Sequence, residues 1–243
     1  MQPHPPKLAF CHWDSVHFGL RIGRVLPTTL DAELSKEALD WANESSLNCL
    51  YLLLDSRDAT GIRLANESGY RIVDVRVTLS AKLANLGEIP GAVREANTND
   101  LPYLRELAKR SHRSSRFYAD GNFSEIACDE LFATWIERSV REREFAGVVF
   151  VPLLEGDRPG GYITCAVKNG MGEIGLIAVD KTASRSGLGT ALLATSAKWF
   201  REQGLEHVSV VTQGSNIPAL RMYERFGFRI ESTQLWFHWW RKR

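Results

Sequence analysis

The stretch from Ile174 to Leu193 constrains the fold of this chain most, because it places a polar turn with two glycines between an apolar strand and a helix. Gly187 and Gly189 leave the backbone N–H groups of residues 185–190 uncovered at a helix N-terminus, where the helix dipole adds about half a positive charge. A tight turn that simply needs glycine is the alternative. The G-K-S/T of a P-loop is missing, as is an acidic residue on a second parallel strand about 20 residues later, which a dinucleotide fold would need. The pattern therefore indicates an anion-binding turn of another kind.

The charge balance requires such binding to be local. The 30 Lys and Arg oppose 29 Asp and Glu, so a net charge of +1 provides no general attraction for nucleic acid or an anionic membrane. The longest nearly apolar run, residues 145–154, is about half as long as a membrane helix. We expect a soluble protein that binds neither nucleic acid nor membrane. The N-terminal residues lack an apolar stretch of signal-peptide length, which favours the cytoplasm.

The cysteines and histidines show no spacing typical of a metal site or a disulfide framework. A G-x-S-x-G motif, the mark of many serine hydrolases, is missing too. We expect no bound metal, and buried reduced thiols in place of disulfides.

Apolar periodicity and turn signals predict an α/β chain with a mixed sheet, in two parts separated by a Gly- and Pro-containing boundary at residues 80–92. The predicted domains are residues 1–85 and 93–243. In the first part we expect helices at 31–45 and 55–68 and strands at 47–54 and 70–79. In the second we expect helices at about 100–110, 129–142, 187–203 and 217–226, strands near 147–154, 161–168, 172–179, 207–212 and 228–240, and a loop over 111–123.

The two parts share an internal similarity. Residues 50–77 and 208–235 have the same predicted order of strand, polar turn, helix and strand, and their junctions read Gly69-Tyr-Arg-Ile72 and Gly227-Phe-Arg-Ile230. A four-residue match of common residue types can arise by chance, but the matching order around it favours a duplication. The N-terminal domain would then be a partial copy of the larger one.

The second part carries motifs of a known family. V-D-K-T-A-S-R-S-G-L-G-T-A-L-L, followed after a strand by N-I-P-A-L-R-M-Y-E-R-F-G-F, resembles the coenzyme A site of the GNAT superfamily of N-acetyltransferases over about residues 93–243. Further motifs resemble the TDP-fucosamine (TDP-4-amino-4,6-dideoxy-galactose) acetyltransferase group, whose members also have an N-terminal partial copy of the fold. They are H-W-D-S-V-H-F-G-L-R-I-G-R-V near the start, S-S-R-F-Y-A-D with F-x-x-W-I-E-x-x-V in the middle, and T-Q-G-S-N-I-P-A-L-R-M-Y-E-R-F-G-F near the end.

The resemblance implies that acetyl-CoA, or another acyl-CoA, is the co-substrate. Ser184 stands where the family has Arg or Gln, so the backbone is expected to contribute more to this phosphate site than that side chain. The residues that the resemblance assigns to the co-substrate are Leu176, Ile177, Ala178, Val179, Ser184, Arg185, Ser186, Gly187, Leu188, Gly189, Thr190, Asn216 and Met222.

GNAT enzymes transfer the acyl group by direct attack of an amine on the thioester. The resemblance makes Tyr223 the acid that protonates the departing thiolate. Its reference pKa of about 10 exceeds the roughly 8.5 of a thiol, so unassisted donation is uphill by about 2 kcal/mol. Asp74 is the candidate base for the amine, and an exposed strand carboxylate or an ion-pair partner is the alternative.

The acceptor residues are expected between the first two helices of the larger domain. A nucleotide sugar needs cations for its diphosphate and an aromatic face for its base, and this segment offers His112, Arg116, Phe117 and Tyr118. A solvated loop is the alternative. The aromatic run at residues 235–240 is expected to be core and interface strand, and pairing of edge strands would give a homodimer.

The sequence thus predicts an N-acetyltransferase acting on a TDP-linked amino-dideoxysugar in polysaccharide biosynthesis. A GNAT enzyme acting on a peptide N-terminus, polyamine or aminoglycoside is one alternative. A noncatalytic CoA-binding protein is another.

Overall fold

The computed structural model describes residues 6–89, 91–183 and 186–242. They form two compact units that interleave along the chain. Unit 1 comprises residues 1–76, 115–127 and 233–243, and unit 2 comprises residues 77–114 and 128–232. Each unit combines helices with strands in a mixed sheet, which confirms the predicted fold class.

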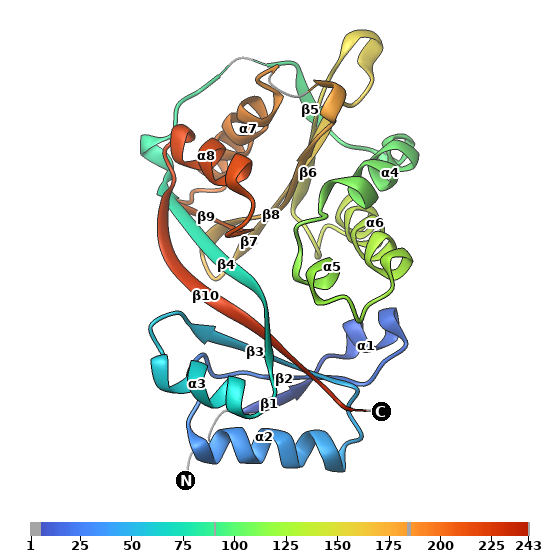
Figure 1. Cartoon of the computed structure of the whole chain (residues 1–243). Coiled ribbons are helices and arrows are strands. Elements are labelled where there is room, and N and C mark those ends of the chain that lie inside the picture. The colour runs from blue at the N-terminus through green and yellow to red at the C-terminus, as the bar shows by residue number, and fades with distance from the viewer. Residues whose placement is uncertain (1–5, 90, 184–185, 243) are drawn as a thin grey trace. The chain divides into compact units, whose positions relative to one another are not determined.

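Unit 1 is built around strand β3 (Cys49–Asp55), whose apolar run is buried apart from its last residue. The sheet order in this unit is β1-β2-β3-β10-β4, in which β2 runs parallel and β10 antiparallel to β3. Helices α2 and α3 lie next to the strands of this unit (Figure 1). Leu34, Ala38, Ala42 and Ala65 of these helices pack against buried strand residues. The other elements of this unit are β1 (Leu8–Phe10), α1 (His12–Phe18), β2 (Ile22–Val25), α2 (Ala32–Glu44), α3 (Ala59–Glu67), α5 (Arg116–Asp120), and parts of β4 (Arg71–Lys82) and β10 (Arg229–Trp240).

Local sequence explains most element ends in unit 1. Asp31 caps α2 by accepting the Leu34 N–H at 2.8 Å, as expected for a helix beginning there. The predicted helix at 55–68 begins later, because the strand continues to Asp55 and Asp58 caps α3 by accepting the Gly61 N–H. The short elements over residues 8–25 were not predicted, since they are too brief to show periodicity.

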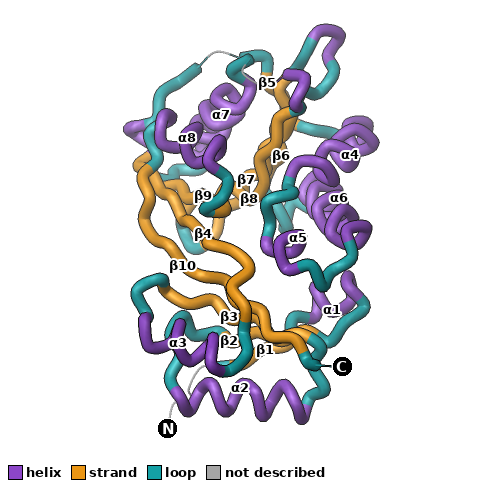
Figure 2. The backbone as a smooth tube through the Cα atoms, in the orientation of Figure 1, coloured by secondary structure: helices purple, strands orange, loops and turns teal. Residues whose placement is uncertain are grey.

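Unit 2 has the strand order β10-β4-β9-β8-β7-β6-β5. Strands β6, β7 and β8, which match the strands predicted near 147–154, 161–168 and 172–179, form an antiparallel meander, and β9 pairs with β8 in parallel. Helices α7 and α8 lie on one side of the strands, and α4 and α6 on the other (Figures 1 and 2). The elements are α4 (Leu101–Ser111), α6 (Glu125–Arg141), β5 (Val93–Glu95), β6 (Val148–Pro152), β7 (Gly161–Lys168), β8 (Met171–Val179), α7 (Leu188–Glu202), β9 (His207–Gln213) and α8 (Ile217–Phe226), together with parts of β4 and β10.

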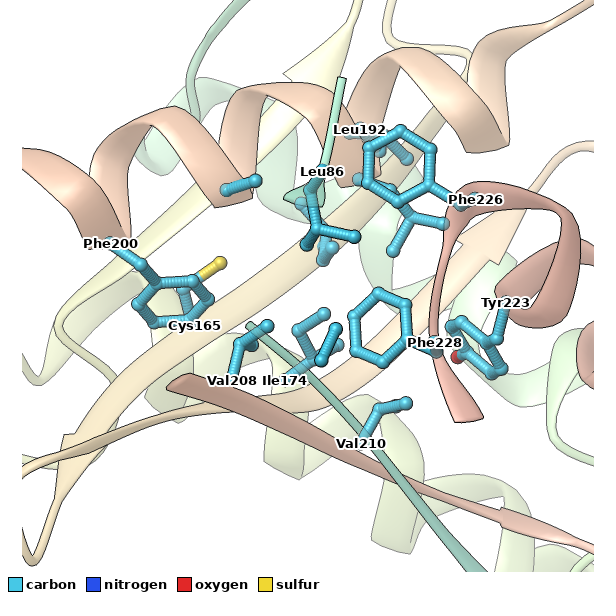
Figure 3. Packing of buried hydrophobic residues seen from close by; sticks show 14 of the residues in the cluster. Leu86, Cys165, Ile174, Leu192, Phe200, Val208, Val210, Tyr223, Phe226 and Phe228 are labelled. Carbon is cyan, nitrogen blue, oxygen red and sulfur yellow. The ribbon is translucent and has the colours of Figure 1, made fainter. Parts of the chain in front are cut away.

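The core of unit 2 lies between the strands and helices α7 and α8. Phe200 of α7 and Tyr223 of α8 are both buried among strand residues that include Cys165 and Ile174 (Figure 3). Helix α7 agrees with the helix predicted at 187–203. This packing fixes the N-termini of both helices relative to the end of β8.

Two sequence predictions differ from the structure around α4 and α6. The predicted loop over 111–123 contains the short helix α5, and the helix predicted at 129–142 begins at Glu125. Asn97 caps the short turn at Thr98–Asp100 that leads into α4, through a capping box with Asp100. Closely spaced polar residues offer several competing caps, so the sequence alone does not select one.

The internal similarity corresponds to matching elements. β3, α3 and β4 follow one another in the N-terminal stretch, and β9, α8 and β10 do so in the C-terminal stretch. Gly69 and Gly227, which follow the two helices, have φ values of +83° and +116°. These left-handed conformations favour glycine, which explains why the two junctions share that residue.

Arg241 ties the end of the chain to helix α2. Its Nε donates to the Leu47 carbonyl at 2.9 Å, and its Nη2 donates to the Ala42 carbonyl at 2.7 Å and the Asn43 carbonyl at 3.2 Å. These carbonyls lie at or just beyond the C-terminal end of α2, where a cation is favourable. The contacts also anchor the end of β10.

Arg241→Gln should lower the free energy of unfolding by about 1–3 kcal/mol, because charge-assisted hydrogen bonds to backbone carbonyls are lost. Urea unfolding followed by tryptophan fluorescence measures the change. The exposed neighbour Lys242 gives a matched control, since Lys242→Gln should change stability by less than about 0.5 kcal/mol. Equal effects of the two substitutions would contradict the anchoring role.

Candidate functional site

Strand β8 opens away from β9 toward its C-terminal end. Its pairing with β7 continues to Val179, whereas its register with β9 covers only Gly172 to Ile174 in the described part of the chain. Backbone groups of Ile177 to Val179 therefore have one edge outside the ladder with β9. An extended ligand can pair with such an edge.

A bulge produces the opening. The register of β7 and β8 shifts between Ile163 and Cys165, and the Thr164 hydroxyl accepts the Leu176 N–H at 2.8 Å. Thr164 is 2% exposed, so this hydroxyl replaces a missing backbone acceptor inside the unit. A Cβ on Gly175 would lie 2.8 Å from the same hydroxyl, which explains the glycine in β8.

Asp180 fixes the chain where it leaves β8. Its carboxylate accepts hydrogen bonds from the Tyr103 hydroxyl at 2.7 Å, Arg110 Nη2 at 2.8 Å and the Thr182 N–H at 3.0 Å. Hydrogen bonds from the Thr182 backbone and from Tyr103 lower the pKa of Asp180 to about 2. The turn therefore starts from a rigid, ionised anchor.

The turn ends at the N-terminus of α7. Gly187 is the N-cap residue of the helix, with a φ of +81°. It has no side chain that could accept a hydrogen bond from the first N–H groups of the helix. The Ala191 N–H donates to the Gly187 carbonyl, and among the described residues the N–H groups of Leu188, Gly189 and Thr190 have no helical acceptor. These N–H groups are the donors that anion binding at this turn would use, while the predicted Ser184 and Arg185 lie outside the described residues.

Helices α7 and α8 meet closely beside this turn. A Cβ on Gly189 would lie 2.7 Å from Met222 Sδ, so glycine allows the close approach. A groove of about 670 Å³ follows the contact, and two exposed arginines of α8 line it. Sequence reasoning missed these arginines, although their i, i+4 spacing in the predicted helix at 217–226 was visible. The groove is lined by Gly87, Ile89, Thr190, Ile217, Pro218, Arg221, Met222, Arg225 and Phe226.

Two other predicted residues of α8 have defined surroundings. The Asn216 side chain caps the helix by accepting the Ala219 N–H at 3.3 Å. Tyr223 is 2% exposed and packs near Phe228, with ring centres 5.7 Å apart (Figure 3). Burial raises the pKa of Tyr223 above its ordinary value, so the phenol keeps its proton at neutral pH.

The predicted acceptor residues divide between the units. His112 belongs to unit 2, where it stacks on Phe132 and lies 2.7 Å from the Tyr162 hydroxyl, and burial lowers its pKa to about 4. Arg116, Phe117 and Tyr118 belong to α5 in unit 1. The contacts of His112 are therefore with residues of unit 2.

Within unit 1, Arg116 is half-buried and lies against aromatic rings. Its guanidinium carbon lies 4.1 Å from the Tyr51 ring centre and 4.4 Å from that of Trp236. Phe117 is buried and packs against Phe18, with ring centres 5.3 Å apart. Tyr118 is half-buried.

A histidine connects Arg116 to a buried carboxylate. Arg116 Nη1 donates to His238 Nε2 at 2.6 Å, so His238 carries its proton on Nδ1 and donates it to Asp120. Asp120 also accepts the Trp240 indole N–H at 2.9 Å. Burial lowers the pKa of His238 to about 4, which keeps the ring neutral. Sequence reasoning assigned the aromatic run at residues 235–240 to core and interface, and it missed the polar contacts of His238 with Arg116 and Asp120.

Asp74, the candidate base, is half-buried on β4 in unit 1. Burial raises its pKa to about 6, against smaller opposing effects of the Val75 backbone and the Arg116 charge. A carboxylate with this pKa is ionised at neutral pH and is a better base than an ordinary aspartate.

Neither a cluster of metal-ligating residues nor a helix able to cross a membrane is found among residues 6–89, 91–183 and 186–242. The four cysteines are free thiols, and burial raises the pKa of Cys165. Such a thiol stays protonated and makes a poor nucleophile.

Comparison with known proteins agrees with this geometry. A model of the acetyltransferase (GNAT) family matches residues 102–228. The dTDP-fucosamine acetyltransferase of Escherichia coli O6:H1 is 26% identical over 228 residues, which cover 93% of this chain and 95% of that protein. The spore coat polysaccharide biosynthesis protein SpsD of Bacillus subtilis is 29% identical over 141 residues, 58% of this chain and only about half (48%) of SpsD.

A solved GCN5-related N-acetyltransferase from Sphaerobacter thermophilus superimposes with a TM-score of 0.64 at 14% identity, covering 90% of this chain and 72% of that one. At this identity the likeness shows a shared fold.

Thr164→Val should cost about 1–3 kcal/mol of stability, because the buried Leu176 N–H loses its acceptor. Hydrogen exchange at the Leu176 amide should accelerate together with a fall in the urea midpoint. Thr164→Ser keeps the hydroxyl and is the matched control. Unchanged exchange at Leu176 in Thr164→Val would show that the hydroxyl does not maintain the bulge.

Proposed function

Because this chain belongs to the acetyltransferase (GNAT) family and is an acyltransferase, we propose that it transfers an acetyl group from acetyl-CoA to the amino group of a TDP-linked amino-dideoxysugar. The opening of β8 beside the N-terminus of α7 carries the donor half of the proposal. The match to a dTDP-fucosamine acetyltransferase along nearly all of both chains supports the acceptor half.

Acetyl-CoA is the usual co-substrate of this family, and the residues of unit 2 suit its parts. The free edge of Ile177 to Val179 would pair with the amide groups of pantetheine. The N–H groups of Leu188 to Thr190 would bind the diphosphate, with Arg221 and Arg225 in the adjoining groove for further phosphate charge. Ser184 and Arg185 remain proposed contributors.

The thioester is attacked directly by the amine in this proposal. Tyr223 would protonate the leaving thiolate, since burial keeps the phenol in its protonated form, ready to donate. A dry site would raise the pKa of the thiol as well, which offsets the rise in the pKa of Tyr223. Asp74 would accept the proton of the amine.

Of the acceptor residues, Arg116 is the one whose surroundings fit phosphate recognition. Its charge, flat geometry and aromatic neighbours are those that nucleotide diphosphates need. We propose Tyr118 as a further wall, while His112 and Phe117 would act through packing. A role in polysaccharide biosynthesis, a cytoplasmic location, a homodimer, and the partial copy at residues 1–85 beside a catalytic domain at 93–243 belong to the same proposal.

A panel of amines tests the proposal. The purified protein is incubated with acetyl-CoA and TDP-3-amino- or TDP-4-amino-dideoxyhexoses, a peptide, a polyamine or an aminoglycoside, and thiol release is followed. We expect release with at least one nucleotide sugar. Release with only the other amines would overturn the acceptor assignment, and release with none would favour a noncatalytic CoA-binding protein.

Tyr223→Phe should lower kcat by about 100-fold or more, because the leaving thiolate loses its acid. The KM for acetyl-CoA should change little, since the ring and its packing remain. Steady-state kinetics measure both constants, and circular dichroism serves as the folding control. Full turnover in the variant would remove Tyr223 as the acid.

A basic Asp74 predicts a specific pH profile. The carboxylate must be ionised to accept a proton, so kcat/KM should fall as pH drops through about 6, approaching tenfold per pH unit below it. In Asp74→Asn this limb should disappear and the rate at pH 8 should fall by at least about tenfold. Tyr223→Phe is the control, because it should retain the limb. A limb that survives in Asp74→Asn belongs to another group.

A further inference from the structure

Unit 1 holds a second arginine beside Arg116. Arg24 on β2 is half-buried, and its guanidinium carbon lies 5.1 Å from the centre of the Trp236 ring, against which Arg116 also packs at 4.4 Å. Burial and the charge of Arg116 both lower the pKa of Arg24. Two guanidinium groups therefore share one aromatic neighbour although they repel each other.

Arg24 has an unused hydrogen-bond donor. Its Nε is buried and lacks a hydrogen-bond partner among the residues that the structure describes. Stacking on Trp236 engages the face of a guanidinium and leaves the N–H groups at its edge in need of acceptors. Packing alone therefore does not account for an arginine at this position.

The acidic groups nearby do not meet this need. Asp14, which is 20% exposed, lies 3.9 Å from Arg116 Nη2, beyond hydrogen-bond distance. Asp120 is 1% exposed and is engaged by His238 and Trp240. Cys11 is neutral, because burial raises its pKa to about 11. Around Arg24 and Arg116, hydrogen-bond donors thus outnumber the available acceptors, and such an arrangement suits an anion.

The shape of the cluster indicates a phosphate group. A guanidinium presents two parallel N–H donors that match two oxygens of a phosphate, and two such groups around one aromatic ring suit a phosphate attached to a planar base. His238 holds Nη1 of Arg116 through a neutral ring whose proton is fixed on Nδ1 by Asp120. The orientation of Arg116 is therefore set before any ligand binds.

We propose that Arg24 and Arg116 together bind the diphosphate of the acceptor beside Trp236, and that His238 and Asp120 are positioning residues for Arg116. The proposal rests on the nucleotide-sugar acceptor of the proposed function. It adds Arg24 as a specificity-determining residue on an element that the CoA site does not use.

Binding of thymidine diphosphate to the whole protein tests this without any acetyl transfer. Isothermal titration calorimetry compares thymidine diphosphate, inorganic pyrophosphate and 3′,5′-ADP, the last representing the phosphates of coenzyme A. Arg24→Gln should weaken thymidine diphosphate binding at least about tenfold, since charge-assisted hydrogen bonds are lost, and should leave 3′,5′-ADP binding unchanged. Pyrophosphate should bind more weakly than thymidine diphosphate and show the same dependence on Arg24.

Arg57→Gln is the matched control, because Arg57 is an arginine of unit 1 whose side chain is 89% exposed and paired with Asp55. Arg24→Lys keeps the charge but not the two-pronged geometry, and should weaken binding at least about threefold. If Arg24→Gln is too unstable for calorimetry, the affinity of Arg24→Lys for thymidine diphosphate tests the proposal instead.

The outcomes separate this inference from the proposed function. Wild-type affinity in Arg24→Gln and Arg24→Lys, absence of thymidine diphosphate binding, or an equal loss of 3′,5′-ADP binding would each overturn the inference. If thymidine diphosphate binds through Arg24 while only other amines are acetylated, the anion site stands and the proposed acceptor fails. If nucleotide sugars are acetylated with the same KM in Arg24→Gln, the acceptor stands and the inference fails.

The positioning role of His238 has its own measurement. His238→Gln retains an acceptor for Arg116 and a donor for Asp120, whereas His238→Leu retains neither. His238→Leu should raise the KM for the nucleotide sugar at least about fivefold with kcat nearly unchanged, and His238→Gln should restore most of the loss. Identical KM values in the two variants would show that His238 only fills space.

Discussion

The hydrogen bond from the Leu176 N–H to the Thr164 hydroxyl is the contact on which the proposed donor site depends. It allows β8 to lose one register step against β7 without leaving a buried N–H unsatisfied. The bulge turns the end of β8 away from the ladder with β9, and the opened edge leads to Asp180 and the turn before α7. The Thr164 side chain inside the sheet thus supports the bulge that leaves backbone groups of β8 open to an extended ligand.

The proposed anion binding relies on local geometry because the net charge is only +1. In unit 2 the donors would be N–H groups at the start of α7, and the carboxylate of Asp180, which precedes this turn, is engaged by Tyr103 and Arg110. In unit 1 the donors would be arginine side chains on aromatic rings. The two kinds of donor differ in selectivity. Helix N–H groups bind many kinds of phosphate, whereas paired arginines require phosphate oxygens in a fixed arrangement.

The sequence predicted helices α7 and α8 because their signals are local. The glycines of the turn, the period of α7 and the residues of α8 all lie within a few residues of the structure they specify. The cluster around Arg116 was only partly predicted. Its partners Arg24, Trp236 and His238 are far from it in the sequence, and only the pairing of β3 with β10 brings Tyr51 next to His238. Helix α5 escaped prediction because five residues show no helical period.

The strand order gives the internal similarity a physical meaning. In unit 1, β10 lies between β3 and β4, and in unit 2, β4 lies between β9 and β10. The last strand of the C-terminal stretch, β10, thus separates the two strands of the N-terminal stretch. Likewise β4, the last strand of the N-terminal stretch, separates the two strands of the C-terminal stretch. A duplication that preserved this exchange would account for Gly69 and Gly227 at the same point. The predicted boundaries at residues 85 and 93 follow the sequence similarity, whereas the compact units follow the contacts, since unit 1 includes residues 233–240 in its sheet.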